Sequence, residues 1–270
     1  MQDRYVGDVG DYAKLALLRA LSPGRRLGVA WWRYPDESHT ADGRHIDYLN
    51  QPPRWRHLDP ELFDGLSRIV HAGERKLAAL QAEGLLGEAV FCDEMMPTRL
   101  SSARLRVERE AWFARVQARL AACDLVFVDP DNGLEPAGYS LGAASGGKCV
   151  SVAQLRSLSA PGRALIVYHH QTRRKGGHLA ELAYWTERLR REAFDAVDVI
   201  RARSYSPRAF FLLNASNDVR RRAELLVQRW EERMSWHTGP AEAGALLSPG
   251  LLQADRPTLV HRIRTWLRGR

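Results

Sequence analysis

The turn at residues 129–132, Asp-Pro-Asp-Asn, carries the clearest chemical signal in the sequence. It follows the apolar run Leu125–Val128, and its proline restricts the backbone. Such a turn can direct the Asp129 carboxylate and the Pro130 carbonyl at one point, where both accept hydrogen bonds from a planar amine. An ordinary Asx-Pro turn closed by Asn-Gly accounts for the same residues without any chemistry. These residues alone leave both interpretations open.

Polar side chains also follow three other expected strands, Arg26–Trp32, Ala89–Cys92 and Ala164–Tyr168. They are, in chain order, Asp36, Glu37 and His39; Asp93 and Glu94; and His169 and His170. Ligands of open α/β sheets bind outside the carboxyl ends of the parallel strands. We therefore expect the four segments to converge on one pocket. Because side chains alternate along a strand, one of the two adjacent imidazoles should face this pocket and the other should pack away from it.

The elements that position these groups alternate between strands and helices. The apolar runs at 125–128 and 164–168 are typical of parallel strands covered on both faces. Apolar periodicity predicts helices over 10–21, after Asp59-Pro60, and over 104–122, 177–192, 218–236 and 258–267, while 196–201 and 209–213 should form an antiparallel hairpin at the sheet edge. The pattern predicts a Rossmann-like α/β fold of methyltransferase type. We expect this domain to cover residues 1–216, with a helical C-terminal extension at 217–270 packed on it.

The composition limits the class of protein. The chain has 270 residues, 45% of them apolar, and 40 basic against 32 acidic side chains, a formal net charge of +8. Three widely spaced cysteines form no pair suited to zinc binding or disulfide exchange. No apolar run is as long as a membrane helix, and Met1–Arg4 does not open a signal peptide, so we expect a soluble, cytoplasmic protein with no membrane partner. The positive charge permits RNA or DNA as a partner without requiring it, and the oligomeric state is not indicated.

Four motifs together distantly resemble the J-type 23S ribosomal RNA adenine-N6 methyltransferases. Asp11 and Lys14 keep the D-x-x-K spacing of their first helix, and Glu94–Pro97 is similar to their E-L-H-P element. Residues 129–132 resemble their D-P-P-Y tetrad, and Phe210–Leu213 resembles their terminal strand. The order of the four is the same. The segments R-Y-V-G-D-V-G-D, P-D-E-S-H-T-A-D-G and V-D-P-D-N-G-L-E more closely resemble a group of bacterial proteins of unassigned activity.

The resemblance implies an S-adenosylmethionine-dependent methyltransferase that acts on an amine of a nucleic-acid base. It implies that the amine is held by Asp129, Pro130, Asp131 and Asn132, and that the cofactor is bound by Asp11, Lys14, Asp36, Asp93 and Glu94. Tyr34, His39, Glu135, His169, His170, Arg173 and Arg174 would contact the substrate. Two departures stand out. No glycine-rich loop follows the first strand, and Asn132 replaces the aromatic residue that stacks on a flipped base, a role that Tyr34 or Tyr168 would take.

The same acids support two other hypotheses. Asp36, Asp129, Asp131 and Glu135 offer the oxygen ligands that Mg²⁺ or Mn²⁺ prefers, and such a metal would activate water for hydrolysis of a phosphodiester. Arg173 and Arg174 would then grip the phosphates. The third possibility is a nucleic-acid-binding relative without catalysis, since the glycine-rich loop is missing.

Overall fold

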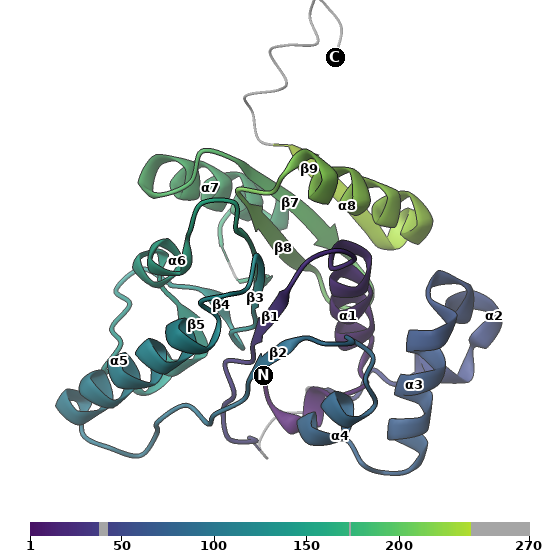
Figure 1. Ribbon diagram of the computed structural model, residues 1–270, viewed down its shortest axis with the longest axis horizontal. Helices are drawn as coiled ribbons and strands as arrows, with labels where there is room; N and C mark the ends of the chain where they lie inside the picture. The colour runs from purple at the N-terminus through teal and green to yellow at the C-terminus, as the bar shows by residue number, and fades with distance from the viewer. Residues whose placement is uncertain (38–42, 173, 239–270) are drawn as a thin grey trace, which may run out of the picture. The chain divides into compact units, whose positions relative to one another are not determined.

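The computed structural model describes residues 1–37, 43–172 and 174–238 (Figure 1). Its centre is a seven-stranded sheet in the order β2-β1-β3-β6-β8-β7-β9. The strands are β1 (Leu27–Ala30), β2 (Val90–Cys92), β3 (Leu125–Val128), β6 (Ala164–His170), β7 (Val197–Ala202), β8 (Arg208–Leu213) and β9 (Met234–Thr238). Two short strands, β4 (Gly133–Leu134) and β5 (Cys149–Val150), form a separate parallel pair. The expected mixed α/β, Rossmann-like fold is confirmed.

Helices cover both faces of the sheet and bury two apolar cores. One core is formed with α1 (Val9–Leu21), α3 (Pro60–His71) and α8 (Asn217–Trp230), and the other with α5 (Ser102–Arg119), α6 (Val152–Leu158) and α7 (Gly177–Glu192). The two sets lie on opposite sides of the sheet (Figure 1). Two short helices, α2 (Pro52–Trp55) and α4 (Leu77–Ala82), lie beside α3, and 3-10 turns occupy Asp3–Tyr5, Asp47–Asn50, Arg56–Leu58, Ala144–Lys148 and Glu231–Arg233.

Side-chain caps fix where two helices of the first core, α1 and α3, begin. The Asp8 carboxylate accepts from the backbone N–H of Asp11 at the start of α1. Asp59 caps α3 in the same way, and Pro60 fills its first turn, where no backbone donor is needed. The cap at Asp8 sets the register of α1, so that the side chains of Asp11 and Lys14 lie on the same face.

The strand order departs from the sequence prediction at one end of the sheet. The predicted antiparallel hairpin exists as β7 and β8, with Ala202 opposite Arg208. It does not lie at the edge, because β8 is inserted between β6 and β7 and is buried along its whole length. The edge is β9, which pairs antiparallel with β7. Every residue of β8 is therefore fixed by a neighbour on each side.

The predicted helix over 218–236 is wrong in its last part. Helix α8 stops at Trp230, where Glu231 adopts a φ of 50°, and Met234–Thr238 forms β9 instead. Alternation of apolar and polar side chains at 234–237 suits a strand better than a helix. Residues 217–238 thus contribute both a covering helix and a strand of the central sheet. The predicted helix over 258–267 lies outside the described residues. Within the part of the chain that is described, no helix is both long and apolar enough to cross a bilayer.

Candidate functional site

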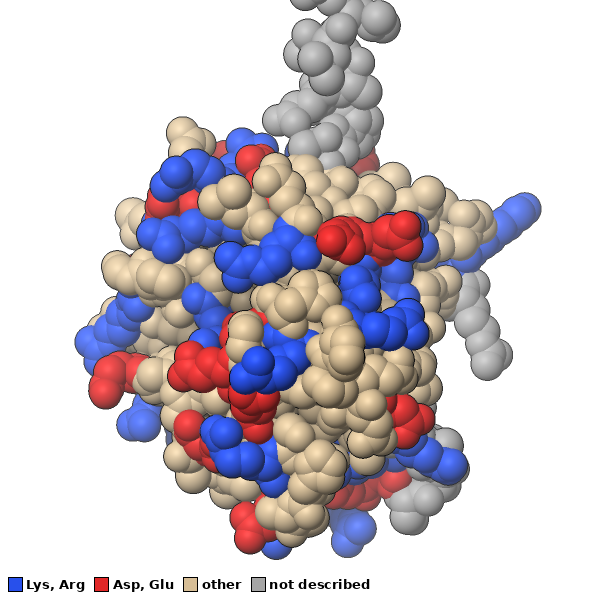
Figure 2. Space-filling view, turned by 90° about the vertical axis from the view of Figure 1, so that its right-hand side faces the viewer, with Lys and Arg blue, Asp and Glu red and all other residues tan. Residues whose placement is uncertain are grey.

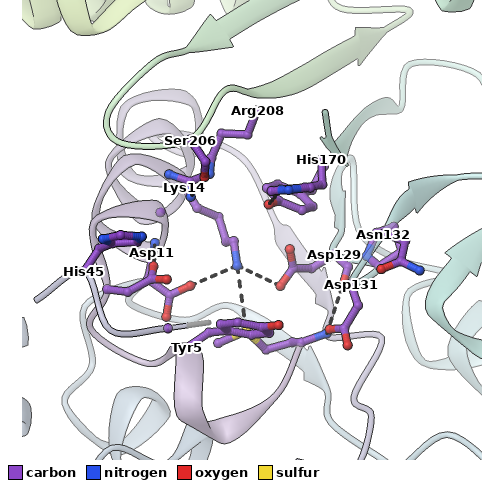
Figure 3. A pocket seen from close by; sticks show the side chains of 16 residues that line it. Tyr5, Asp11, Lys14, His45, Asp129, Asp131, Asn132, His170, Ser206 and Arg208 are labelled. Atoms are coloured by element: carbon purple, nitrogen blue, oxygen red, sulfur yellow. Dashed lines mark hydrogen bonds and ion pairs between the residues drawn. The ribbon is translucent and has the colours of Figure 1, made fainter. Parts of the chain in front are cut away.

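A cavity of about 270 Å³ lies at the carboxyl ends of β3 and β6, close to the lower limit of roughly 300 Å³ for small-molecule sites (Figure 3). The start of α1, the turn after β3, the end of β6 and the β7–β8 hairpin supply most of its walls. The lining residues are Met1, Tyr5, Asp8, Gly10, Asp11, Lys14, Gly43, His45, Asp129, Pro130, Asp131, Asn132, Tyr168, His170, Ser206 and Arg208.

Lys14 joins the two principal motifs at this cavity. Its Nζ lies 2.9 Å from Asp11 Oδ1 and 2.9 Å from Asp129 Oδ2 (Figure 3). All three side chains are buried. Burial alone would lower the pKa of Lys14, but the two carboxylates raise it above its ordinary value, so the lysine is charged. Burial, partly offset by Lys14, raises the pKa of Asp11 to about 6.

Asp131 is held apart from this cluster by the N-terminal segment. The amino group of Met1 lies 2.6 Å from Asp131 Oδ1 and also donates to the carbonyl of Trp32 at 2.8 Å. Gln2 Nε2 donates to Asp131 Oδ2 at 2.6 Å. Burial would raise the pKa of Asp131, but the amino group and Gln2 outweigh it and lower the pKa. Asp131 is thus an ionised carboxylate with committed partners, whereas Asp129 Oδ1 has no hydrogen-bond partner among the described residues.

The two adjacent histidines face opposite sides of the sheet, as strand alternation predicts. His170 lines the cavity, and Tyr168 lies on the same side. His169 is fully buried on the other side, where its Nδ1 accepts from the Leu134 N–H at 3.0 Å and its Nε2 lies 3.1 Å from Glu181 Oε1. Because Nδ1 accepts a hydrogen bond, the ring proton is assigned to Nε2, which donates to Glu181. Predicted as a substrate contact, His169 instead lies outside the cavity.

Gly133 explains how the turn after β3 approaches His169. Its φ is 94°, and a Cβ at this position would lie 2.3 Å from the His169 ring. Glycine is needed both for this backbone conformation and for the close contact. The Asn132-Gly133 pair therefore closes the turn as the simple turn interpretation predicts, while Asp129 and Pro130 still face the cavity.

The predicted convergence of four strand ends is seen for the ends of β3 and β6, whose segments line the cavity. Asp36 and Glu37 after β1 and Asp93 and Glu94 after β2 are not in the lining, and residues 38–42 lie outside the described part of the chain. Glu94, predicted to bind the cofactor, is exposed and bonded to Arg115 Nε at 2.9 Å. Asp93 and Asp36 are likewise absent from the lining, and Asp36 Oδ1 lies 3.5 Å from the backbone nitrogen of Arg4. In the order β2-β1-β3, β2 lies two strand spacings, roughly 10 Å, from β3.

Most of the predicted substrate contacts also lie elsewhere. Tyr34 donates to the Ala144 carbonyl at 3.3 Å, Glu135 is paired with Arg188, and the Arg174 guanidinium lies 3.5 Å from the centre of the Tyr184 ring. His39 and Arg173 lie outside the described residues. Of the described members of this group, only His170 lines the cavity, and Tyr168, the alternative to Tyr34, does so too.

The acids predicted as metal ligands are dispersed. Asp129 and Asp131 line the cavity, but Asp36 and Glu135 do not. Among the described residues, no group of three or more His, Cys, Asp or Glu side chains is arranged to hold a metal ion. A cation near Asp129 would compete with Lys14 for Oδ2.

Sequence reasoning missed one wall of the cavity. Ser206 and Arg208 come from the β7–β8 hairpin, and His45 from the segment before the 3-10 turn at Asp47. The signal for the hairpin was present as the polar run 203–207 between two expected strands, but its position depends on strand pairing. The face of the molecule shown in Figure 2 gives no comparable signal, because basic and acidic side chains are interspersed over its described part.

Comparisons with known proteins assign no relative. No protein-family model matches the chain, and no curated protein matches it either. The functional argument therefore depends on the geometry of the cavity and on the motifs that line it.

Proposed function

We propose that this protein is an S-adenosylmethionine-dependent methyltransferase that modifies an amine, with a base of RNA or DNA as the acceptor. The observation that carries the proposal is the contact between Lys14 and Asp129. These residues belong to two motifs that resemble one enzyme family, and they lie 115 positions apart in the chain. Their side chains line one cavity at the carboxyl ends of parallel strands, where ligands of α/β sheets bind.

The sheet order supports the same class. The reversed strand β8 lies between the last two parallel strands, β6 and β7, an arrangement that methyltransferase-type Rossmann sheets share. The order of the parallel strands reverses between β1 and β3, which places a ligand site near β3.

The Asp129-Pro130 turn would orient the acceptor. Asp129 Oδ1 and the Pro130 carbonyl accept the two hydrogens of the amine and so direct its lone pair into the cavity. Lys14 holds Asp129 in place through Oδ2, at 2.9 Å. When bound, S-adenosylmethionine supplies an electrophilic methyl group. The chain then contributes orientation and proximity, and no strong base is required because the amine proton can leave after transfer.

The charges of the cavity suit the aminoacyl end of the cofactor. Four aspartates, Asp8, Asp11, Asp129 and Asp131, line it together with the cations Lys14 and Arg208 and the Met1 amino group. Asp11 Oδ2 is buried without a hydrogen-bond partner. Acidic walls favour a ligand that carries a sulfonium and an ammonium group. Asp8 and Asp11 would hold the ammonium group. The ribose end has no corresponding carboxylate in the lining, since Asp93 and Glu94 lie outside it.

Transfer of a labelled methyl group tests the proposal. Purified protein is incubated with methyl-labelled S-adenosylmethionine and, separately, with unmodified RNA, DNA and free nucleosides. We expect incorporation into one acceptor, its loss in Asp129→Ala, and its retention in Glu94→Gln, which alters an exposed carboxylate outside the cavity. No incorporation into any acceptor, or equal incorporation by Asp129→Ala, would contradict the proposal.

A further inference from the structure

Arg208 is a buried cation without a carboxylate partner. Its side chain lines the cavity, and the residue is only 5% exposed. Its bonds go to neutral oxygens, with Nη2 3.0 Å from Ser206 Oγ and Nη1 3.4 Å from the Ser204 carbonyl. Nε has no partner. The guanidinium forms no ion pair with a described carboxylate. Burial would lower its pKa, but the hydroxyl of Tyr168 and the charges of Asp8 and Asp11 lie close enough to raise the pKa. Since a buried charge is costly unless it is paired, this arginine is suited to an anion supplied from outside the chain.

The backbone around Arg208 directs it at the cavity. Arg208 is the first residue of β8 and lies opposite His170 of β6 and Ala202 of β7, so its position is fixed on both sides. At the hairpin tip, Tyr205 has a φ of 65°, which is uncommon for a residue with a side chain. The turn that it forms presents Ser206 and Arg208 to the cavity together (Figure 3).

Helix α1 supplies a second favourable element. Gly10, in the first turn of this 13-residue helix, has no side chain, and a Cβ there would lie 2.8 Å from Arg208 Cζ. The glycine thus leaves room for the guanidinium beside the N-terminal end of the helix, where the helix dipole favours anions. The two nearby carboxylates have other partners, since Asp8 accepts the Asp11 N–H and Asp11 Oδ1 is bound to Lys14, and neither forms an ion pair with Arg208.

We propose that Arg208 and Ser206, beside the first turn of α1, form an oxyanion-binding subsite of the cavity. It would hold a carboxylate or phosphate group, for which the planar guanidinium provides two parallel donors. The identity of the anion rests on the proposed function, which offers two sources: the carboxylate of S-adenosylmethionine or a phosphate of the nucleotide acceptor. The subsite itself rests on Arg208, Ser206 and the first turn of α1, and not on the proposed function.

Calorimetric titrations with four probes separate these sources. They are S-adenosylmethionine, its decarboxylated analogue, adenosine monophosphate and inorganic phosphate, tested against the wild-type protein, Arg208→Met and Arg208→Lys. We expect Arg208→Met to weaken binding of an oxyanion probe at least tenfold. The affinity of Arg208→Lys should lie between those of the wild-type protein and Arg208→Met, because lysine keeps the positive charge but lacks the two parallel donors of the guanidinium. Arg221→Gln, on an exposed arginine of α8, serves as the control and should change nothing.

Each pattern of results has one meaning. Weaker binding of S-adenosylmethionine with unchanged binding of the decarboxylated analogue assigns the subsite to the cofactor carboxylate. Weaker binding of adenosine monophosphate and phosphate, with S-adenosylmethionine unaffected, assigns it to the acceptor. The subsite is rejected if the wild-type protein binds none of the oxyanions, or if Arg208→Met binds them all as the wild-type protein does.

Two further readouts keep the test independent of folding and of catalysis. Gly10→Ala retains the arginine but displaces its guanidinium, so we expect weaker oxyanion binding in a variant that still melts cooperatively. Oxyanion binding that depends on Arg208, in a protein that transfers no methyl group, would reject the proposed function and keep the subsite. Methyl transfer by the wild-type protein, together with oxyanion binding that is unchanged in Arg208→Met, would reject the subsite alone.

Discussion

Lys14 of α1 and Asp129 after β3 form a buried ion pair at 2.9 Å, and Asp11 contacts the same ammonium group at 2.9 Å from the other side. The lysine holds two carboxylates that would otherwise repel each other in a low-dielectric environment. Asp11 and Lys14 belong to helix α1, and Asp129 directly follows strand β3. The cluster therefore holds these two walls of the cavity together.

Removal of the central cation should be strongly destabilising. Lys14→Met leaves Asp11 and Asp129 buried without their counter-ion, and breaking a buried ion pair in this way costs about 3–5 kcal/mol. Chemical denaturation should show this loss as a lower midpoint. Arg115→Gln removes an exposed ion pair with Glu94 and should leave the midpoint nearly unchanged. Equal effects of the two substitutions would contradict the role of Lys14.

The two substitutions of Asp129 should differ in activity. Asp129→Asn keeps an oxygen that accepts from an amine, so we expect measurable methyl transfer, whereas Asp129→Ala removes the acceptor and should reduce kcat by about 100-fold or more. Asp11 still pairs with Lys14 in both variants, so both should fold. Single-turnover rates compare them, and an alanine variant that is faster than the asparagine variant would argue against amine orientation.

Asp11 should make ligand binding and stability depend on pH in opposite directions. Its pKa in the folded protein, about 6, is raised from 3.8, so the folded state binds the proton more tightly than the unfolded state. The contribution of Asp11 to stability is complete below about pH 4 and is lost as the pH rises through 6. Affinity for a cationic ligand should instead increase over that range, because the carboxylate becomes charged.

Comparison with Asp11→Asn isolates this dependence. His45 and His170 also line the cavity, so only the part of the pH profile that the asparagine variant loses is assigned to Asp11. Titrations with S-adenosylmethionine between pH 5 and pH 8 measure it. An asparagine variant with the wild-type profile would show that Asp11 does not titrate in this range.

His169 should contribute to stability and not to binding. His169→Phe removes the bonds to the Leu134 N–H and to Glu181 in a fully buried site, leaving polar groups without partners at about 1–3 kcal/mol each. Gly133→Ala, which forces a Cβ into the His169 ring, should act in the same direction. We expect lower melting temperatures with an unchanged dissociation constant for S-adenosylmethionine. Weaker binding of S-adenosylmethionine without a loss of stability would indicate that His169 contributes to the ligand site.

The fold was predictable from the sequence where the pattern of apolar residues indicates which segments are buried. The continuous apolar runs that became β3 and β6 are long enough to distinguish strands covered on both faces, and the capped helices begin close to where they were expected. Strand β9 was missed because Met234–Thr238 directly follows a helix and has few apolar residues. Alternation over so short a segment is a weak signal for a strand, and the segment was therefore assigned to the helix that precedes it.

The site was predictable only in part. Asp129 and Lys14 could be grouped because their motifs resemble those of one enzyme family, and the two side chains are in contact. Glu94 was misplaced because the sequence does not report that β2 lies two strands from β3. Arg208 was missed for a related reason, since the insertion of β8 between β6 and β7, which the sequence pattern does not reveal, places the hairpin at the cavity.

Calorimetric titration of S-adenosylmethionine into the wild-type protein, Asp11→Asn and Glu94→Gln tests the central claim most directly. We predict one bound molecule per chain in the wild-type protein, at least tenfold weaker binding in Asp11→Asn, and wild-type affinity in Glu94→Gln. The absence of binding to the wild-type protein, or a loss confined to Glu94→Gln, would contradict a cofactor site between α1 and the 129–132 turn.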